Sequence, residues 1–204
     1  MGRVTPAVGP VVLPGSLRAG PQPELTAAGA LRLRPWRPDA PGDVEAVLAA
    51  FADPEIQRWG IRDVGDAAQA RAWMSGWATG WDAETDACWA VVHDGVVVGR
   101  VALRRLDLAA GQAEITYWVL PDARGRGVAS RAAAEVARWA FEAVGLHRIE
   151  LWHSVHNEAS CRVARRLGLP LEETVRDGML HVDGWHDLHL HAAVSHRRPP
   201  LPVT

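Results

Sequence analysis

The sequence predicts a mixed α/β (α+β) fold, in which helices cover both faces of one sheet. Short segments alternate apolar and polar residues as strands do, and longer segments repeat apolar residues at helical spacing. Asp94-Gly95 and Asp183-Gly184 mark tight hairpins, which join antiparallel strands. The predicted order is a strand, two helices, three strands, a helix, a strand, a helix and two strands, which gives a mixed sheet of about seven strands.

Length, charge and cysteine content narrow the class of protein. The 204 residues are enough for one domain, and a net charge of −2 provides no overall basic field for nucleic acid or an anionic membrane. Cys88 and Cys161 form neither a disulfide framework nor a metal knuckle, and no apolar segment resembles a membrane span or a signal peptide. We therefore expect a cytoplasmic protein with no nucleic-acid or membrane partner.

The two ends of the chain are expected to lie outside the domain, which is predicted to span residues 29–195. Residues 1–28 are rich in proline and glycine, which is typical of a flexible leader or of a strap lying on the domain. Residues 196–204 are expected to form a flexible tail for the same reason.

Within the domain, the strand "ALRLRPWRP" is followed by a helix that begins near Asp43. In the next helical segment Trp73, Trp77 and Trp81 recur every four residues. This stripe either faces the core or forms an aromatic wall of a substrate cleft. The strands that follow are "CWAVVHDGVVVGRVALRRL", which forms a hairpin, and "AEITYWVLP".

A glycine-rich turn after "AEITYWVLP" predicts an anion site. The strand ends at Leu120 and a helix begins near Gly127, so the amides of the loop at 121–126 have no strand or helix partner. These donors and the positive end of the helix dipole favour an anion, and the two glycines of "RGRG" let the chain approach it closely. A pyrophosphate fits this pattern.

Other interpretations of the turn are possible. A Walker loop needs a lysine, and the chain contains none. A dinucleotide fingerprint needs glycine at the position of Ser130 and an early βαβ unit, although Glu150 lies near the spacing of its acidic residue. The simplest alternative is a turn that needs glycine only for its backbone geometry.

The motif Arg124-x-x-Gly127-x-Ala129 resembles the acetyl-CoA signature [RQ]-x-x-G-x-[GA] of the GNAT superfamily of N-acyltransferases. Downstream, "N-x-x-S" at 157–160, an "R-x-L-G" helix end and "GWHDLHLHA" resemble its RimJ/RimL-like branch. The similarity covers roughly residues 30–195. It implies a mostly antiparallel sheet with a V-shaped splay between the fourth and fifth strands.

The resemblance also implies acetyl-CoA as cosubstrate. Its pantetheine arm would lie in the splay and bond to Asn157, and Ser130 would add a hydroxyl near the pyrophosphate. The pyrophosphate itself would sit on the amides of Arg124, Gly125, Arg126, Gly127, Val128 and Ala129.

Glu114 is the leading candidate for the general base. A carboxylate in an apolar strand is costly unless it is used, paired or solvated, and many GNAT enzymes place a glutamate here that acts through water. The alternative is a solvated or salt-bridged glutamate at the start of a strand. A backbone N–H of Val119 or Leu120 would stabilise the oxyanion.

Ser160 matches a serine that the branch places near the thiol, where it would act as the acid; its alternative is a helix cap. Tyr117 lies on the opposite strand face from Glu114 and is expected in the core. The branch often has an acidic residue where this chain has Met179, so either Glu114 acts alone or His181 or Asp187 assists it.

Asp187, His189 and His191 alternate on one strand face, as metal ligands do. We nevertheless expect no metal, because nothing upstream supplies an obvious fourth ligand and the family's last strand carries a similar "HD" without one.

The sequence thus predicts an N-acetyltransferase that acts on a protein or peptide α-amine or on a small amine. One alternative is an antibiotic or polyamine acetyltransferase with an acidic cleft at Asp82, Glu84 and Asp86. Another is an acyl-CoA sensor without turnover. The acceptor loops, 53–87 and 176–186, carry no transferable motif, and a homodimer is compatible with the sequence.

Overall fold

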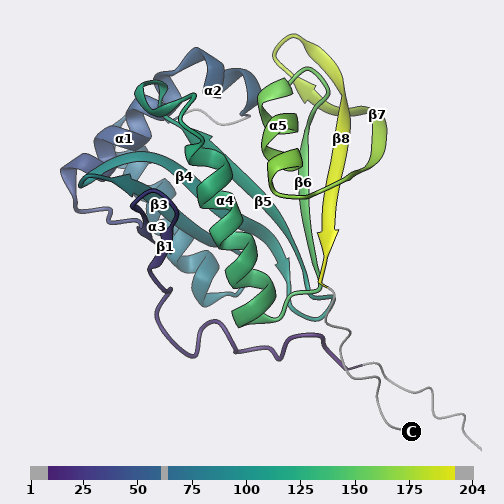
Figure 1. Ribbon diagram of the computed structural model, residues 1–204. Helices are drawn as coiled ribbons and strands as arrows, with labels where there is room; N and C mark the ends of the chain where they lie inside the picture. The colour runs from purple at the N-terminus through teal and green to yellow at the C-terminus, as the bar shows by residue number, and fades with distance from the viewer. Residues whose placement is uncertain (1–8, 61–63, 196–204) are drawn as a thin grey trace, which may run out of the picture.

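A computed structural model describes residues 9–60 and 64–195, which form one mixed sheet with helices on both faces (Figure 1). The eight strands lie in the order β1-β2-β3-β4-β5-β6-β8-β7. All neighbours are antiparallel except β5 and β6. The predicted mixed, mostly antiparallel sheet is confirmed, with one strand more than expected. The strands are β1 Leu25–Ala27, β2 Leu31–Pro35, β3 Ala87–His93, β4 Val96–Asp107, β5 Gln112–Val119, β6 Arg148–Ser154, β7 Leu171–His181 and β8 Gly184–Val194.

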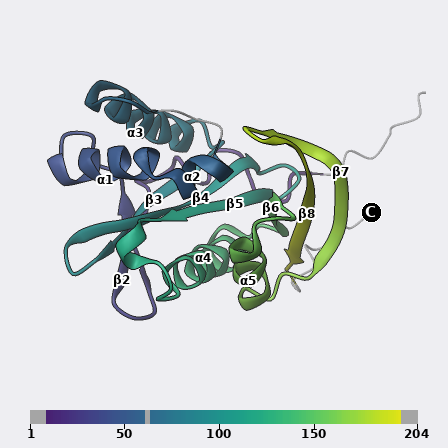
Figure 2. The same ribbon diagram turned by 90° about the horizontal axis from the view of Figure 1, so that it is seen from above.

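The helices divide between the two faces: α1, α2 and α3 cover one, and α4 and α5 cover the other (Figure 2). Several begin at a side-chain cap, as in α3, where Asp66 accepts the N–H of Gln69. Among the described residues, no helix is long and apolar enough to cross a bilayer. The helices are α1 Pro41–Ala52, α2 Pro54–Trp59, α3 Ala67–Asp82, α4 Val128–Trp139 and α5 Glu158–Arg166, with short turns η1 Pro121–Ala123 and η2 Ala140–Val144.

The tryptophan stripe of α3 faces the sheet. Trp81 is buried, and Trp73 and Trp77 pack edge to face against each other with ring centroids 5.4 Å apart. The guanidinium of buried Arg100 lies 4.4 Å from the Trp77 ring centroid, a cation–π contact. The structure therefore favours the core-facing interpretation of the stripe.

Residues 9–24 lie on the domain as a strap that leads into β1. Val12 and Leu17 are buried, and the Glu84 carboxylate accepts the backbone N–H of Gly15 and of Leu17. Since β1 belongs to the sheet, the sheet begins before residue 29. The rest of the expected leader, residues 1–8, and the tail at 196–204 lie outside the described residues.

A buried ion pair fixes α1 to β2. Arg34 donates to both carboxylate oxygens of Asp43, at 2.8 and 2.6 Å, and the Arg37 backbone N–H also donates to that carboxylate. The Arg34 and Asp43 side chains are only 7% and 2% exposed. The pair therefore holds the first turn of α1 against β2.

The predicted V-shaped splay is confirmed, between β5 and β6. The two strands pair only from Gln112↔Arg148 to Glu114↔Glu150. Beyond this point β5 stays on β4, whereas β6 stays paired with β8 as far as Ser154↔Leu188. The strands therefore meet at one end of the sheet and part toward the other (Figure 1).

Replacing Asp43 with Asn should lower the free energy of unfolding by about 3–5 kcal/mol, because Arg34 keeps its charge without a counterion. Urea unfolding measures the change. The matched control is Glu24→Gln, which breaks only exposed pairs, with Arg32 at 3.8 Å and with Arg37 at 3.7 Å, and should cost less than about 1 kcal/mol. Equal losses in the two variants would contradict this view of the buried pair.

Candidate active site

The backbone hydrogen bonds between β4 and β5 show which N–H groups of β5 face the gap. Leu120 donates its N–H to the Val98 carbonyl at 2.9 Å, so Leu120 is bonded to the β4 side. The neighbouring residue, Val119, stands opposite Gly99 in a non-hydrogen-bonded position, and its N–H therefore points toward the gap that β6 has left. Of the two amides predicted as oxyanion donors, only that of Val119 faces the splay.

The loop after β5 exposes the amides of a helix start. Gly127 is the N-cap of α4 in the left-handed region, at φ 72°, with no side-chain cap. The first backbone bond of the helix runs from Arg131 N–H to the Gly127 carbonyl, so the amides of Val128, Ala129 and Ser130 have no intrahelical acceptor. Gly125 also has a positive φ, of 74°, and a Cβ on either glycine would meet nothing within 4 Å. The amides after Arg124 therefore face an open space, whereas the Arg124 amide, which was expected to bind the pyrophosphate, instead donates to the Pro121 carbonyl at 3.1 Å.

The Arg124 side chain holds the loop rather than the anion. Its Nε donates to the Val119 carbonyl at 3.1 Å, and its guanidinium forms an ion pair with Asp53, the N-cap of α2. Hydrogen bonds from Arg124 and the Ile56 amide outweigh the opposing effect of burial and lower the pKa of Asp53. Arg124 thus ties the end of β5 to the start of α2.

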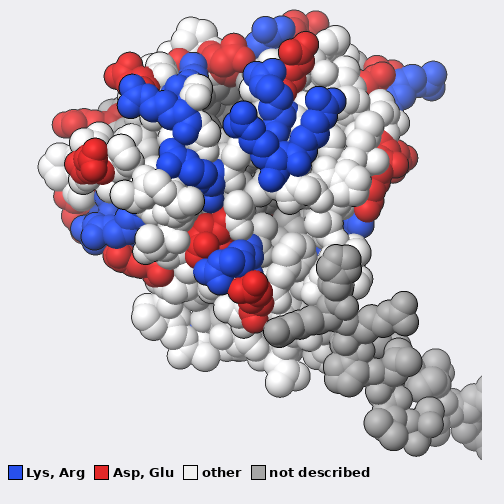
Figure 3. Space-filling view, in the orientation of Figure 1, with Lys and Arg blue, Asp and Glu red and all other residues white. Residues whose placement is uncertain are grey.

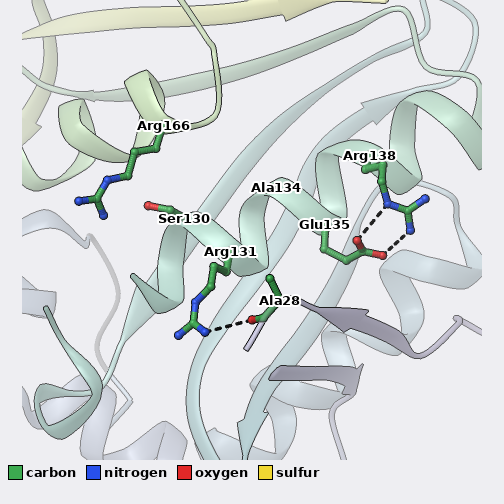
Figure 4. A pocket seen from close by; sticks show the side chains of 7 residues that line it. All are labelled: Ala28, Ser130, Arg131, Ala134, Glu135, Arg138 and Arg166. Atoms are coloured by element: carbon green, nitrogen blue, oxygen red, sulfur yellow. Dashed lines mark hydrogen bonds and ion pairs between the residues drawn. The ribbon is translucent and has the colours of Figure 1, made fainter. Parts of the chain in front are cut away.

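Arg131, which the sequence analysis did not single out, fixes the other side of the loop. Its guanidinium donates to the Arg126 carbonyl and to the Ala28 carbonyl, each at 3.1 Å, and Figure 4 draws the bond to Ala28. Ala28 lies in the turn between β1 and β2, 103 residues from Arg131. Because Arg131 binds the Arg126 carbonyl of the loop, the backbone amides of the loop remain available to a ligand.

A hollow of about 350 Å³ adjoins the loop, between α4, α5 and the β1–β2 turn. The Ser130 hydroxyl and Arg131 lie on one side of it, and Arg166 of α5 lies opposite (Figure 4). Arginines gather over α4 and α5 on this face (Figure 3). Within the described residues, Arg126, Arg165 and Arg166 have no carboxylate partner within 4.0 Å, so this face carries unpaired positive charge despite the net charge of −2.

Glu114 stands at the vertex of the splay, in the last pair that β5 makes with β6. Its side chain is 15% exposed and forms an ion pair at 3.3 Å with Arg105, which sits at an irregularity of β4, so Glu114 is salt-bridged as the alternative interpretation expects. Val119 is five residues further along β5, roughly 16 Å at the rise of a strand. Glu114 can therefore reach a reacting group near Val119 only through water.

Across the gap, α5 presents the predicted polar residues. Asn157 is the N-cap of α5, and its Oδ1 accepts the Ser160 N–H at 3.0 Å, which leaves the Asn157 NH₂ group as a donor. The Tyr117 hydroxyl is buried close to Ser160, although their geometry falls short of a hydrogen bond. Burial raises the pKa of Tyr117 to about 12. Tyr117 packs against the core as expected, but its hydroxyl adjoins Ser160.

The remaining candidates lie at the open end of the splay. His181 contacts the Arg58 carbonyl of α2 at 3.2 Å, and Asp187 accepts the Asp177 N–H at 2.9 Å. Met179 stands opposite His186 in the β7–β8 hairpin. Since Asp53 at the other end of α2 holds Arg124, α2 connects the loop after β5 to this hairpin across the open end.

The sequence matches a known domain family over most of its length. Residues 30–170 match the model of the acetyltransferase (GNAT) domain. In Bacillus subtilis (strain 168), YdaF, whose name assigns it to the ribosomal N-acetyltransferases, is 35% identical over 96 residues. These are 47% of this chain and 52% of YdaF, so the match spans about half of that relative.

Solved structures extend the comparison to the whole fold. Mycobacterium smegmatis RimJ in complex with CoA-disulfide aligns with a TM-score of 0.76 and 26% identity over 89% of each chain. RimL, the ribosomal L7/L12 α-N-protein acetyltransferase in complex with coenzyme A, aligns with a TM-score of 0.79 over 85% of this chain and 98% of RimL. Its identity is 19%, so that likeness concerns the fold.

Gly127→Ala should weaken binding of CoA by about 5- to 30-fold, because a Cβ in the left-handed region costs about 1–2 kcal/mol and disfavours the loop conformation. Isothermal titration calorimetry measures the affinity. Gly145→Ala is the matched control: its φ of 85° imposes similar strain at the other end of the α4–η2 helix, again with nothing within 4 Å of the Cβ. It should lower stability and leave CoA affinity unchanged. Equal weakening in both variants would refute the assignment of the loop.

Proposed function

Because the chain belongs to the GNAT acetyltransferase family and to its RimJ/RimL-like branch, we propose that it is an N-acetyltransferase that moves the acetyl group of acetyl-CoA to a primary amine. The observation that carries the proposal is the splay of β5 from β6 beside an open glycine cradle at the start of α4. A long ligand with a pyrophosphate at one end and amides along its arm suits both features.

In this proposal the pyrophosphate binds the amides of Gly125 to Ser130, and the charged nucleotide end enters the arginine-lined hollow. Arg166 and the Ser130 hydroxyl are the groups available there. The pantetheine arm lies in the splay, where the Asn157 NH₂ group can donate to an amide carbonyl. The free Val119 N–H receives the thioester oxygen as it becomes an oxyanion, a donor typically worth about 2.7–4 kcal/mol.

The remote position of Glu114 suits an acceptor that is nearly neutral. An α-amine with a pKa near 7.7–8.0 is about one pH unit from neutrality at pH 7, and a lysine amine near 10.4 is more than three units away. Glu114 would accept the proton through water. We therefore favour the α-amine of a protein or peptide as acceptor, which agrees with the name of YdaF as a ribosomal N-acetyltransferase.

The proton for the CoA thiolate comes from the hydroxyls beside the gap. Ser160 is the proposed acid, and Tyr117 supplies a second donor next to it. With its pKa at about 12, Tyr117 remains protonated throughout the physiological range. The two hydroxyls would act as one unit.

The acidic-cleft alternative gains no support. Glu84 is occupied by backbone amides of the strap, and Asp86 faces Arg104 at 3.9 Å. A sensor without turnover remains a distinct outcome of the assays below.

Acetyl-CoA incubated with N-terminal peptides should release free thiol, at a higher rate than with aminoglycosides or polyamines. A thiol-specific chromophore follows the reaction, and mass spectrometry locates the acetyl group on the product. Tight acetyl-CoA binding with no thiol release from any amine would identify a sensor and overturn the proposal.

Glu114→Gln should lower kcat by about 10²-fold or more with CoA affinity unchanged, because the amide cannot accept a proton. The control is Glu150→Gln, in the residue opposite in the same strand pair, whose carboxylate is held by Arg148 and Trp152. This control should keep most of the activity. Full activity of Glu114→Gln would show that the base is assigned wrongly.

Ser160→Ala and Tyr117→Phe should each lower kcat more than they change KM, since the acid acts on the leaving group. Residues that act as a unit are not additive, so the double variant should be little slower than the worse single variant. Below pH 10, the pH–rate profile of Tyr117→Phe should have the same shape as that of the unmutated protein, because the pKa of Tyr117 is about 12. If the loss of kcat in the double variant equals the product of the two single losses, Ser160 and Tyr117 act independently and not as one unit.

A further inference from the structure

Four side chains converge between α5 and the sheet on the far limb of the splay. His153 of β6 stands opposite His189 of β8, and His191 lies two residues further along β8. Cys161 approaches from α5, and its Sγ lies 4.0 Å from His191 Nε2. One ligand atom from each residue lies within 4.8 Å of the other three. Two consecutive elements, β6 and α5, thus meet the more distant β8 at one point.

The hydrogen bonds of the rings leave lone pairs facing this point. His153 Nδ1 lies 2.7 Å from the Ser154 carbonyl, and His191 Nδ1 lies 3.1 Å from the Leu169 carbonyl, so each Nδ1 carries the proton. Both Nε2 atoms are then unprotonated. Among the described residues, His153 Nε2 and His189 Nδ1 are buried without any hydrogen-bond partner. Solvent cannot easily supply a partner to His153, because this residue is only 7% exposed.

Buried polar atoms without partners are costly and need a reason. Simple packing explains the stacked rings of His153 and His191, at 5.2 Å, but it does not explain two buried, unpartnered imidazole nitrogens beside a thiol. An imidazole whose other nitrogen donates to a backbone carbonyl is the arrangement seen in metal ligands, because that bond fixes the tautomer and the ring.

We propose that His153, Cys161, His189 and His191 form a tetrahedral site for a divalent transition-metal ion of the Zn²⁺ type. Zinc bound at about 2.0–2.1 Å to nitrogen and about 2.3 Å to sulfur holds its ligands about 3.3–3.7 Å apart, so closure from the present spacing needs shifts of roughly 1 Å or less. The donor set contains no carboxylate, which disfavours Mg²⁺ and Ca²⁺. Coordination converts the Cys161 thiol to the thiolate and releases its proton to solvent.

In the sequence, His189 and His191 group with Asp187, and no obvious fourth ligand lies upstream. The structure turns the Asp187 carboxylate to the Asp177 amide and brings His153 and Cys161 to the histidines instead. With four protein ligands the site is closed, which is typical of structural metals. The ion would clamp α5 onto β6 and β8 and fix the helix turn that carries Ser160.

Cobalt binding tests the site without reference to acetyl transfer. The metal-free, untagged chain, titrated with Co²⁺, should bind one ion per molecule. It should develop a thiolate-to-cobalt charge-transfer band and the intense visible bands of tetrahedral cobalt. Zn²⁺ should displace Co²⁺ and raise the thermal unfolding midpoint, whereas Mg²⁺ and Ca²⁺ should change neither. A chain that shows no tetrahedral bands in excess Co²⁺ would overturn the proposal.

Matched variants locate the ligands. Cys161→Ser should abolish the charge-transfer band and weaken Co²⁺ binding by roughly 100-fold or more, whereas Cys88→Ser, which removes the other cysteine, should keep the band. His153→Gln should weaken binding similarly, and His93→Gln, in a partly exposed histidine beside Asp94, should not. Retention of the charge-transfer band in Cys161→Ser would overturn the site. The spectrum of the unmutated chain serves as the reference, so the site remains testable even if some variants fold poorly.

Discussion

The parting of β5 and β6 after three paired residues is the constraint on which the site depends. Each strand keeps a partner on its other side, β4 for β5 and β8 for β6, so neither needs the other to remain folded. The parting leaves backbone groups of β5, including the Val119 amide, without a neighbouring strand. Such groups need a partner from water or from a ligand. A ligand with its own amides can take the place of the missing strand.

The features predicted from sequence are those that depend on local chemistry. The hairpins at Asp94-Gly95 and Asp183-Gly184 and the glycine turn before α4 are specified by residues next to one another, and the structure has each of them. The family motifs predicted the splay because they identify a known fold.

Other features depend on contacts between distant segments. That the N–H of Val119, and not that of Leu120, faces the splay follows from the register of β5 on β4. The alternation of apolar residues in the sequence does not determine this register to within one residue. Tyr117 was assigned to the core from its strand face alone, but α5 packs over that face and brings Ser160 to its hydroxyl. The histidine cluster needed β6, α5 and β8 to be placed together.

Several acidic groups are satisfied within the fold, whereas arginines over α4 and α5 remain available to a ligand. Asp43 is satisfied by Arg34, Asp53 by Arg124 and Glu84 by the amides of the strap. The arginines over α4 and α5 lack such partners in several cases, and a guanidinium can donate two parallel hydrogen bonds to a phosphate. A chain with a small negative net charge thereby keeps a locally positive surface beside its helix start.

The bond from Arg131 to Ala28 joins the cradle to the outer edge of the sheet. Gly29 follows Ala28 in the same turn, and a Cβ there would come 1.6 Å from Arg131 Nη1. A side chain at this position would displace the guanidinium that holds the loop carbonyls. In a random mutagenesis screen, Gly29 substitutions would therefore be scored as cofactor-affinity defects, although the residue lies nearly a hundred positions before the loop that contacts the ligand.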